Sequence, residues 1–202
     1  IQKARRADEL ELENSNLRYK IAQLKKEKVK AVEQVAEDKN KELSELERAK
    51  LELEKSLKKE IGEYKAKLKM TERGLVITFL SEVFFDSGKN EVKEDGKMAL
   101  NKVAEVLNKN VPNSQVAVEG HTDNNPIKYS GWKSNWELSS GRALSVLHYL
   151  SDECKIEPQR LSANGYGEYR PVAPNDSPEN MQKNRRVEIV ILPSKISKVK
   201  KN

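Results

Sequence analysis

The chain has 202 residues, of which 36% are hydrophobic and 35% are charged. This composition supports one modest hydrophobic core and leaves part of the chain outside it. No eighteen apolar residues run together, so the sequence offers neither a membrane-spanning helix nor a secretory signal peptide. Because the chain begins with Ile1, we expect a fragment or a processed form.

The net charge of +6 lies mostly outside the region that has a globular pattern. Residues 1–73 carry 20 basic and 16 acidic side chains, residues 74–193 carry 14 and 16, and residues 194–202 add four Lys. A basic excess on a solvated helix and tail indicates solubility or attraction to an anionic surface, so we expect no nucleic-acid partner. The lone Cys154 excludes an internal disulfide, and no Cys/His cluster indicates a metal or cofactor.

Residues 1–73 are predicted to form one long helix. Residues 7–70 contain no Pro and a single Gly, and their apolar residues recur at helical spacing. The first part has the a/d pattern of a coiled coil, formed by Ala7, Leu10, Asn14, Leu17, Ile21 and Leu24. The pattern then slips by one residue and resumes at Val29, Val32, Ala36, Leu43, Leu46, Leu53, Leu57 and Tyr64, interrupted by Lys39, Lys50 and Glu60.

An apolar stripe of this length needs a partner helix, so we expect a parallel coiled coil with a second copy of the chain through residues 1–73. The alternative is a solvated single helix that Glu/Lys pairs stabilise. In either case about seventy helical residues would span roughly 100 Å and act as a spacer.

A second region, residues 74–193, is predicted where the hydrophobic period changes from 3.6 to 2 at Gly74. The expected strands are 75–79, a short one that begins at Val83 and ends in a turn, 114–120, 160–167 and 185–192. Helices are expected over 91–110 and 135–153. Strands that alternate with helices predict an α+β sandwich, one mixed sheet covered by helices. The basic tail, residues 194–202, is predicted to be disordered.

A polar loop connects the strand 114–120 to the helix 135–153, and such loops commonly hold ligand contacts. Asp123 lies in this loop, and Arg142 shares one face of the helix with Asn135, Leu138 and Ser139. An Arg can bind a carboxylate while an Asp accepts from an ammonium, so the two could hold a zwitterionic amino-acid head group. The alternative is that Asp123 and Arg142 merely pair with each other.

Five separated motifs carry a family resemblance: VFFDSGKNEV, VEGHTDN, SNWELSSGRALSVLHYL, RLSANGYGEYRPVAPN and NRRVEIVI. Their order and approximate spacing are similar to those of the OmpA-like C-terminal domain, and most of all to its flagellar stator B (MotB-like) branch. The resemblance covers about residues 74–193. It implies a βα/βα/β-type fold that binds the peptide stem of peptidoglycan, chiefly its diaminopimelate.

The resemblance also assigns the residues of the binding site. Asp123 would take the ammonium of the ligand and Arg142 its carboxylate. The other members are Thr122 and Asn135, which would add hydrogen bonds, Asp86 and Ser87 on the opposite wall, the apolar Leu138, and Arg185, structural or flanking. Gly141 departs from the family's pattern, in which a better helix former usually precedes the Arg.

No catalytic set is apparent, so we expect a protein that is not an enzyme. His121 and Asp123 have no third metal ligand at a suitable spacing, and His121 is predicted to be a buried hydrogen-bonding residue at the end of a strand. Trp132 and Trp136 are predicted either to cap the site or to pack beneath it.

Together these features predict a periplasmic domain that anchors a membrane-attached complex to the cell wall, as a stator B-type subunit of a motor. The expected partners are peptidoglycan, a second copy of the chain and a membrane ion-channel subunit reached through an upstream segment. An outer-membrane or lipoprotein tether would use the same domain, and a coiled-coil scaffold that binds a protein is a second alternative. Attachment to the inner or outer membrane would lie in a segment outside this chain.

Overall fold

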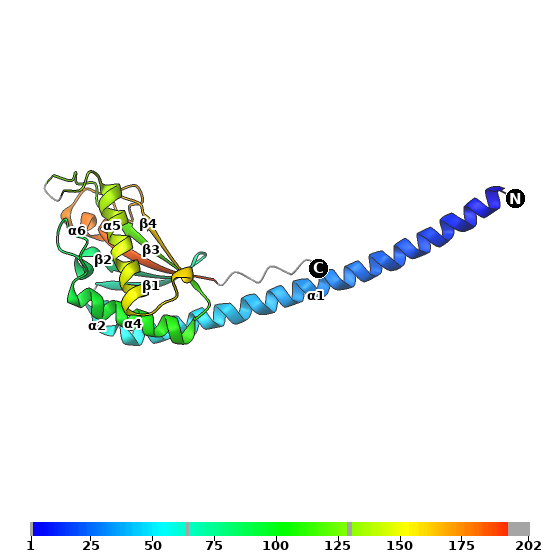
Figure 1. Ribbon diagram of the computed structural model, residues 1–202, viewed down its shortest axis with the longest axis horizontal. Coiled ribbons are helices and arrows are strands. Elements are labelled where there is room, and N and C mark those ends of the chain that lie inside the picture. Colours follow the sequence, from blue (N-terminus) through cyan, green and yellow to red (C-terminus); the bar gives the residue numbers. More distant parts are fainter. Residues whose placement is uncertain (1, 64, 129–130, 194–202) are drawn as a thin grey trace. The chain divides into compact units, whose positions relative to one another are not determined.

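The computed structural model describes residues 2–63, 65–128 and 131–193 (Figure 1). The predicted disordered tail and Tyr64 of the predicted apolar seam lie outside these residues. The chain divides into two compact units, one that includes Ile1–Lys41 and one, Glu42–Lys195, that contains the sheet. No helix among the described residues is long and apolar enough to cross a membrane.

The first unit is the N-terminal part of helix α1, which runs over Gln2–Ser56. Its apolar seam is solvent-exposed: between 48% and 60% of the surface is accessible at Leu10, Leu17, Ile21, Leu24, Val29 and Val32. The helix surface also carries short-range pairs, such as Arg6 Nη1 with Glu9 Oε2 at 3.2 Å. The structure thus confirms a helix in this N-terminal part of the chain. No described residue covers the apolar stripe of the helix.

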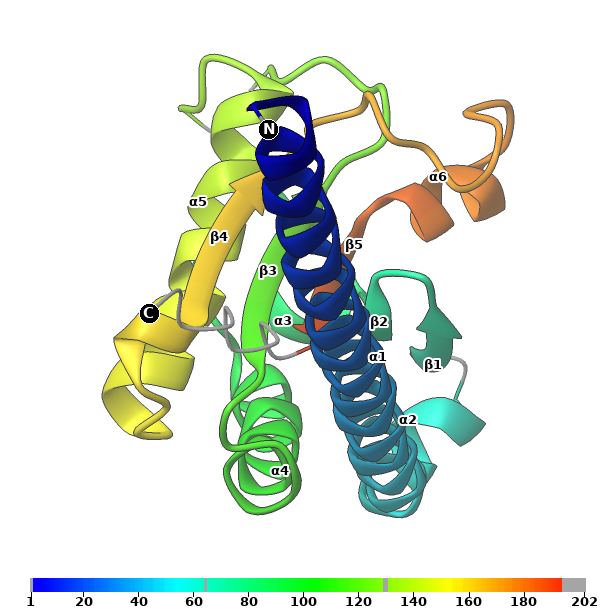
Figure 2. The ribbon, with the colours of Figure 1, turned by 90° about the vertical axis from the view of Figure 1, so that its right-hand side faces the viewer.

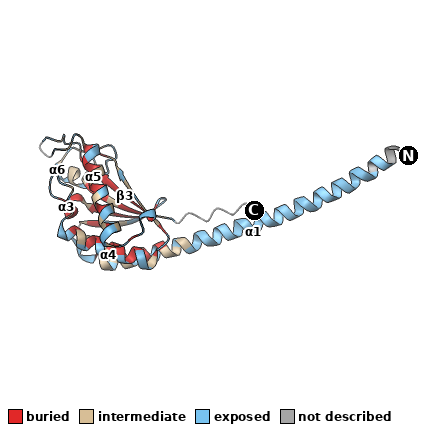
Figure 3. Cartoon of the chain, viewed as in Figure 1, coloured by how far each residue is buried: buried red, intermediate tan, exposed pale blue. Residues whose placement is uncertain are grey.

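The C-terminal part of α1 belongs to the second unit and corrects the prediction of one seam over residues 1–73. Leu46, Ala49 and Leu53 of α1, and Leu57 directly after it, are at most 2% exposed and pack in the core of the sheet-containing unit. Apolar residues at helical spacing fit any apolar surface, so the pattern alone could not distinguish a second chain from the protein's own core. Figure 3 shows the corresponding change along α1 from exposed to buried residues.

The predicted continuation of the helix to residue 73 was wrong. After α1 comes a single turn, α2 (Lys58–Gly62), and then strand β1 (Ala66–Thr71). β1 pairs antiparallel with β2 (Gly74–Leu80), so that Leu68 lies opposite Ile77. Lys and Met favour helices, but the alternation of apolar and Lys residues in AKLKMT fits an edge strand, and pairing with β2 overrides helix propensity.

The sheet is mixed and has the strand order β1-β2-β5-β3-β4, which Figure 2 shows side by side. The remaining strands are β3 (Gln115–His121), β4 (Leu161–Gly165) and β5 (Arg186–Leu192). β5 pairs antiparallel with both β2 and β3, whereas β3 and β4 are parallel. The predicted α+β fold with one mixed sheet is therefore confirmed.

Helices α4 (Glu94–Asn110) and α5 (Asn135–His148) share one core with the sheet and the end of α1. A π-helical turn, Tyr149–Glu153, extends α5, and a 3₁₀ turn, Pro158–Arg160, precedes β4. Helix α6 (Pro178–Asn184) leads into β5.

The predicted short strand at Val83 is instead helix α3 (Ser81–Phe84). Three consecutive buried residues, Val83, Phe84 and Phe85, have no period that could distinguish strand from helix. Phe84 packs edge-on against Phe79 of β2, with ring centroids 5.0 Å apart. The turn that follows the short helix, residues 86–89, is closed by a hydrogen bond from the Lys89 N–H to the Asp86 carbonyl at 3.1 Å.

If the end of α1 is part of the core, Leu53→Ala should lower the free energy of unfolding by about 2–5 kcal/mol, because it removes a fully buried side chain. Leu51→Ala on the same helix is the matched control: Leu51 is 58% exposed, so we expect a change within about 0.5 kcal/mol. Urea denaturation of both variants measures the difference. Equal midpoints for the two variants would contradict the assignment of this segment to the core.

Candidate functional site

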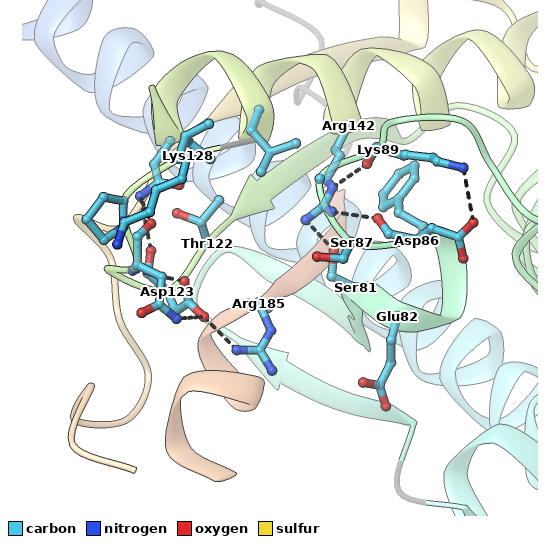
Figure 4. A pocket seen from close by; sticks show the side chains of 17 residues that line it. Ser81, Glu82, Asp86, Ser87, Lys89, Thr122, Asp123, Lys128, Arg142 and Arg185 are labelled. Atoms are coloured by element: carbon cyan, nitrogen blue, oxygen red, sulfur yellow. Dashed lines mark hydrogen bonds and ion pairs between the residues drawn. The ribbon is translucent and has the colours of Figure 1, made fainter. Parts of the chain in front are cut away.

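An open pocket of about 920 Å³ lies where β3, α5, the turn after α3 and the end of α6 meet (Figure 4). All eight residues that the sequence analysis placed at the site line it: Asp86, Ser87, Thr122, Asp123, Asn135, Leu138, Arg142 and Arg185. These residues come from segments up to about a hundred positions apart, so only the fold brings them together. The pocket has charged groups of both signs in its lining.

The start of helix α5 fixes three of these residues. Ser134 is the N-cap and its hydroxyl accepts from the backbone N–H of Glu137, while the Glu137 carboxylate accepts from the N–H of Lys133 at 2.9 Å. This reciprocal arrangement resembles a capping box and sets the first helical residue at Asn135. One face of α5 therefore presents Asn135, Leu138 and Arg142 to the pocket. Ser139, which was predicted on the same face, does not line the pocket and accepts from the Gly167 N–H instead.

Two glycines let α5 approach the sheet closely. A Cβ atom on Gly120 would lie 2.2 Å from the carbonyl oxygen of Ser139, and one on Gly165 would lie 2.1 Å from the hydroxyl of Ser140. Any larger residue at either position would force the helix outward. The close approach keeps the Arg142 side chain within reach of the turn after α3.

Arg142 is 5% exposed, and its guanidinium makes three hydrogen bonds, all to uncharged acceptors. Nε donates to the Lys89 carbonyl at 2.9 Å, Nη1 to the Ser81 hydroxyl at 3.1 Å and Nη2 to the Asp86 carbonyl at 3.2 Å. The group also lies over the Phe85 ring, 5.1 Å from its centroid. Burial lowers the pKa of Arg142 to about 10, so the side chain stays charged at neutral pH.

No carboxylate among the described residues lies within ion-pair distance of Arg142. A guanidinium has five N–H groups, so two remain available after the three bonds above. Arg142 is thus a buried cation with free donors and without a contacting anion.

Asp123 is paired with Arg185 and not with Arg142, so the alternative of a mutual Asp123–Arg142 pair was wrong. Its Oδ2 accepts from Arg185 Nη1 at 2.5 Å, and the backbone N–H and the side-chain amide of Asn125 both donate to the carboxylate at 3.1 Å (Figure 4). Asp123 is 5% exposed, whereas the Arg185 side chain is 39% exposed. Arg185 therefore has a defined structural position as the countercharge of Asp123.

The polar residues around the Asp123–Arg185 pair differ in whether their side chains already have a hydrogen-bonding or charged partner. Asn135 donates its amide to the Asn125 carbonyl at 3.1 Å and to Glu168 Oε2 at 2.7 Å, so it holds two loops. The buried hydroxyl of Thr122 has no partner among the described residues. The Asp86 carboxylate is exposed and lies near Lys89 and Lys93, at 3.7 and 3.6 Å.

Trp132 explains the unusual Gly141. The Trp132 indole N–H donates to the Gly88 carbonyl at 2.9 Å, and a Cβ atom on Gly141 would lie 2.7 Å from the indole ring. The glycine therefore makes room for a ring that joins the loop before α5 to the turn after α3. Trp132 packs beside the site, whereas Trp136 is 48% exposed on the first turn of α5.

Ser81 and Phe85 contact the Arg142 guanidinium and were not predicted as site residues. Ser81 lies in no quoted motif, and Phe85 lies in VFFDSGKNEV, where it has the pattern of a core residue. Their position directly after β2, next to the start of β5, brings them to the pocket: the Ser81 N–H donates to the Arg185 carbonyl at 2.8 Å.

A second polar cluster lies elsewhere on the sheet. Glu119, His121 and Glu188 offer ligand atoms within 4.8 Å of one another, a spacing that could suit a metal ion. However, Arg73 bonds to Glu119 and Arg186 Nε to Glu188 at 2.6 Å. Burial first, and then the Arg charges, lower the pKa of His121 to about 3, and the same positive field disfavours a divalent cation.

We therefore assign this cluster to the structure of the sheet. His121 is 2% exposed, as predicted, and its ring lies 5.2 Å from that of Tyr166. Neither ring nitrogen bonds to a described residue, so its predicted hydrogen-bonding role is not seen.

The known proteins to which the chain is similar include two motility proteins. The chain is 42% identical over 149 residues to Motility protein B of Bacillus subtilis, a match that covers 74% of this chain and 57% of the relative. It is 33% identical over 123 residues to Motility protein B of Helicobacter pylori, covering 60% of this chain and 48% of the relative. The chain thus spans about half the length of these relatives.

Solved structures show the same fold. A putative MotB-like protein from Desulfovibrio vulgaris matches with a TM-score of 0.68 and 28% identity, covering 76% of this chain and 98% of the other. The cell wall anchor of the T6SS from Pseudomonas aeruginosa matches with a TM-score of 0.63 and 32% identity, covering 70% and 96%. The sequence model of the OmpA family matches residues 84–185, which include every residue of the pocket described above except Ser81 and Glu82. The chain therefore belongs to the OmpA family.

Proposed function

We propose that the pocket binds the diaminopimelate-containing stem peptide of peptidoglycan without chemical change. The chain would thereby anchor a membrane-attached complex to the cell wall from the periplasm. Membership of the OmpA family supports this proposal, as does similarity to a protein whose structure is described as a cell wall anchor. The relatives reported above are named for motility or anchoring, which favours binding over catalysis.

The observation that carries the proposal is that Arg142 is buried and charged but contacts no carboxylate. A buried charge is costly unless a countercharge or a full set of hydrogen bonds compensates it. The acceptors of Arg142 are uncharged and two of its N–H groups remain available. A ligand carboxylate would supply both the missing countercharge and the missing acceptors, in the bidentate geometry that a guanidinium favours.

The opposite charge at Asp123 supports a zwitterionic ligand. Its carboxylate keeps acceptor capacity beyond its bonds to Asn125 and Arg185, since two carboxylate oxygens offer about four lone-pair sites. Arg185 is partly exposed and could move to admit an ammonium group. Free diaminopimelate ends carry an ammonium and a carboxylate on one carbon, which matches an acidic and a basic residue in one pocket.

A role as a stator B-type subunit is favoured over a passive wall tether by the extent of the matches. The similarity to Motility protein B of Bacillus subtilis covers 74% of this chain, more than the OmpA domain alone. The similarity to the outer membrane protein Omp38 of Acinetobacter baumannii is 40% and covers 52%. In this proposal a membrane ion-channel subunit is a partner through a segment upstream of the chain.

The exposed seam of α1 supports a second copy of the chain as a further partner. The seam residues from Leu10 to Val32 are about half exposed, whereas those from Leu46 onward are buried in the chain's own core. We therefore narrow the proposed parallel coiled coil from residues 1–73 to about residues 7–41. Asn14 at an a position would favour an in-register pair of two helices.

Asp123→Asn and Arg142→Lys should each weaken binding to purified sacculi at least tenfold, because each change removes a charge-assisted hydrogen bond at one end of the ligand. Co-sedimentation with sacculi measures the effect, and thermal unfolding checks that the variants stay folded. Asp152→Asn and Arg48→Lys are matched controls on the exposed surface and should bind normally. Undiminished binding by both site variants would refute the site.

Sedimentation equilibrium of the full chain should show a dimer that the double variant Leu17→Asp, Leu24→Asp converts to a monomer. Charged side chains facing one another at d positions would oppose pairing of the two helices. Leu12→Asp is the control, because Leu12 is 65% exposed and lies off the a/d seam. A wild-type chain that remains monomeric at high micromolar concentration would rule out the coiled coil.

A further inference from the structure

Two aromatic rings form an exposed stacked pair beside the pocket. The ring centroids of Trp136 and Tyr169 lie 4.9 Å apart at an interplanar angle of 21°. Trp136 is 48% exposed and Tyr169 is 62% exposed. Rings of this size usually pack inside a domain, so a stacked pair left in solvent indicates a surface that meets another molecule.

The pair is held in place by the same residues that shape the pocket. Asn135, which lines the pocket, precedes Trp136 and donates to Glu168 Oε2 at 2.7 Å, and Glu168 precedes Tyr169. Gly167 has a φ of +54°, and a Cβ atom at this position would lie 3.4 Å from the backbone carbonyl carbon of Asn135, so the loop passes close to the start of α5. The two rings are therefore positioned before any ligand arrives, which lowers the entropy lost on binding.

The loop that carries Tyr169 is itself bonded to the sheet and to α5. The Gly167 N–H donates to the Ser139 hydroxyl at 2.9 Å, and the Gly167 carbonyl accepts from the Thr122 N–H at 2.9 Å. Thr122 also lines the pocket. Hydrogen bonds thus connect the loop that carries Tyr169 to the pocket residues Thr122 and Asn135, although neither aromatic ring lines the pocket itself.

The chemistry of the two aromatic rings favours contact with a sugar ring of a peptidoglycan ligand. The faces of aromatic rings carry partial negative charge, which attracts the partially positive C–H groups on the flat side of a pyranose ring. Because Glu168 is already hydrogen-bonded to Asn135, the Trp136–Tyr169 pair offers a ligand its apolar ring surface and the Tyr169 hydroxyl. In peptidoglycan the stem peptide is attached to a sugar, and a stem of three extended residues spans roughly 10 Å.

We propose that Trp136 and Tyr169 form a second subsite that stacks against an N-acetylhexosamine ring of the glycan strand whose stem peptide occupies the pocket. The inference rests on the proposed function, since the pocket must hold the stem for the sugar to reach the rings. It adds recognition of the sugar to recognition of the peptide. The domain would then bind stems attached to glycan in preference to free stem peptides.

Isothermal titration calorimetry of the full chain with two ligands tests the subsite. The ligands are a disaccharide that carries the stem peptide and the same stem peptide without sugar. We expect the wild-type chain to bind the disaccharide form about threefold to tenfold more tightly. Trp136→Ala and Tyr169→Ala should remove this preference and leave the affinity for the bare stem unchanged.

Leu144→Ala is the matched control, because Leu144 is an exposed apolar residue of α5, 47% accessible, that does not line the pocket. It should change neither affinity. Equal affinity of the wild-type chain for both ligands would overturn the inference, as would a Trp136→Ala variant that loses affinity for both. If Trp136→Ala changes only the sedimentation of the chain, the pair is a protein contact and the inference is wrong.

The same titrations separate this inference from the proposed function. If the bare stem binds and the sugar adds nothing, the aromatic subsite is wrong and the stem-binding pocket stands. If the bare stem does not bind to the wild-type chain, the stem-binding proposal is wrong, and the aromatic subsite that rests on it is wrong as well.

Discussion

The buried guanidinium of Arg142 is the interaction on which the rest of the site depends. It binds the hydroxyl of Ser81 and the carbonyls of Asp86 and Lys89, so one side chain joins helix α5 to helix α3 and the turn that follows. The close packing of α5 at Gly120 brings the guanidinium there. Because no described carboxylate contacts it, the fold leaves a positive charge that an anionic ligand can complete.

Much of the domain could be predicted from the sequence because its elements have clear periods. The alternation in β2 and β5 and the helical spacing in α4 and α5 placed these elements, and the eight site residues taken from separated motifs all line the pocket. The pairing of Asp123 with Arg185 could not be predicted, since these residues are 62 positions apart and meet only in the fold. Strand β1 was missed because AKLKMT is made largely of helix-forming residues and continues a helical segment.

The apolar seam of helix α1 is exposed in one part of the helix and buried in another. Near the N-terminus the seam of α1 is exposed, and from Leu46 onward it is buried in the core of the sheet-containing unit. Sequence periodicity reports that a stripe is apolar but not what covers it. In the proposed anchoring role this division would let the OmpA domain fold on its own chain and leave the exposed seam to the proposed second copy.

The central claim is that a ligand carboxylate neutralises Arg142. The most direct measurement compares, by calorimetry with the wild-type chain, a stem peptide whose diaminopimelate has a free α-carboxylate with the same peptide amidated at that group. A neutral amide cannot supply the missing negative charge, so amidation should lower the affinity at least tenfold. Equal affinity for the free and the amidated peptide would contradict the account.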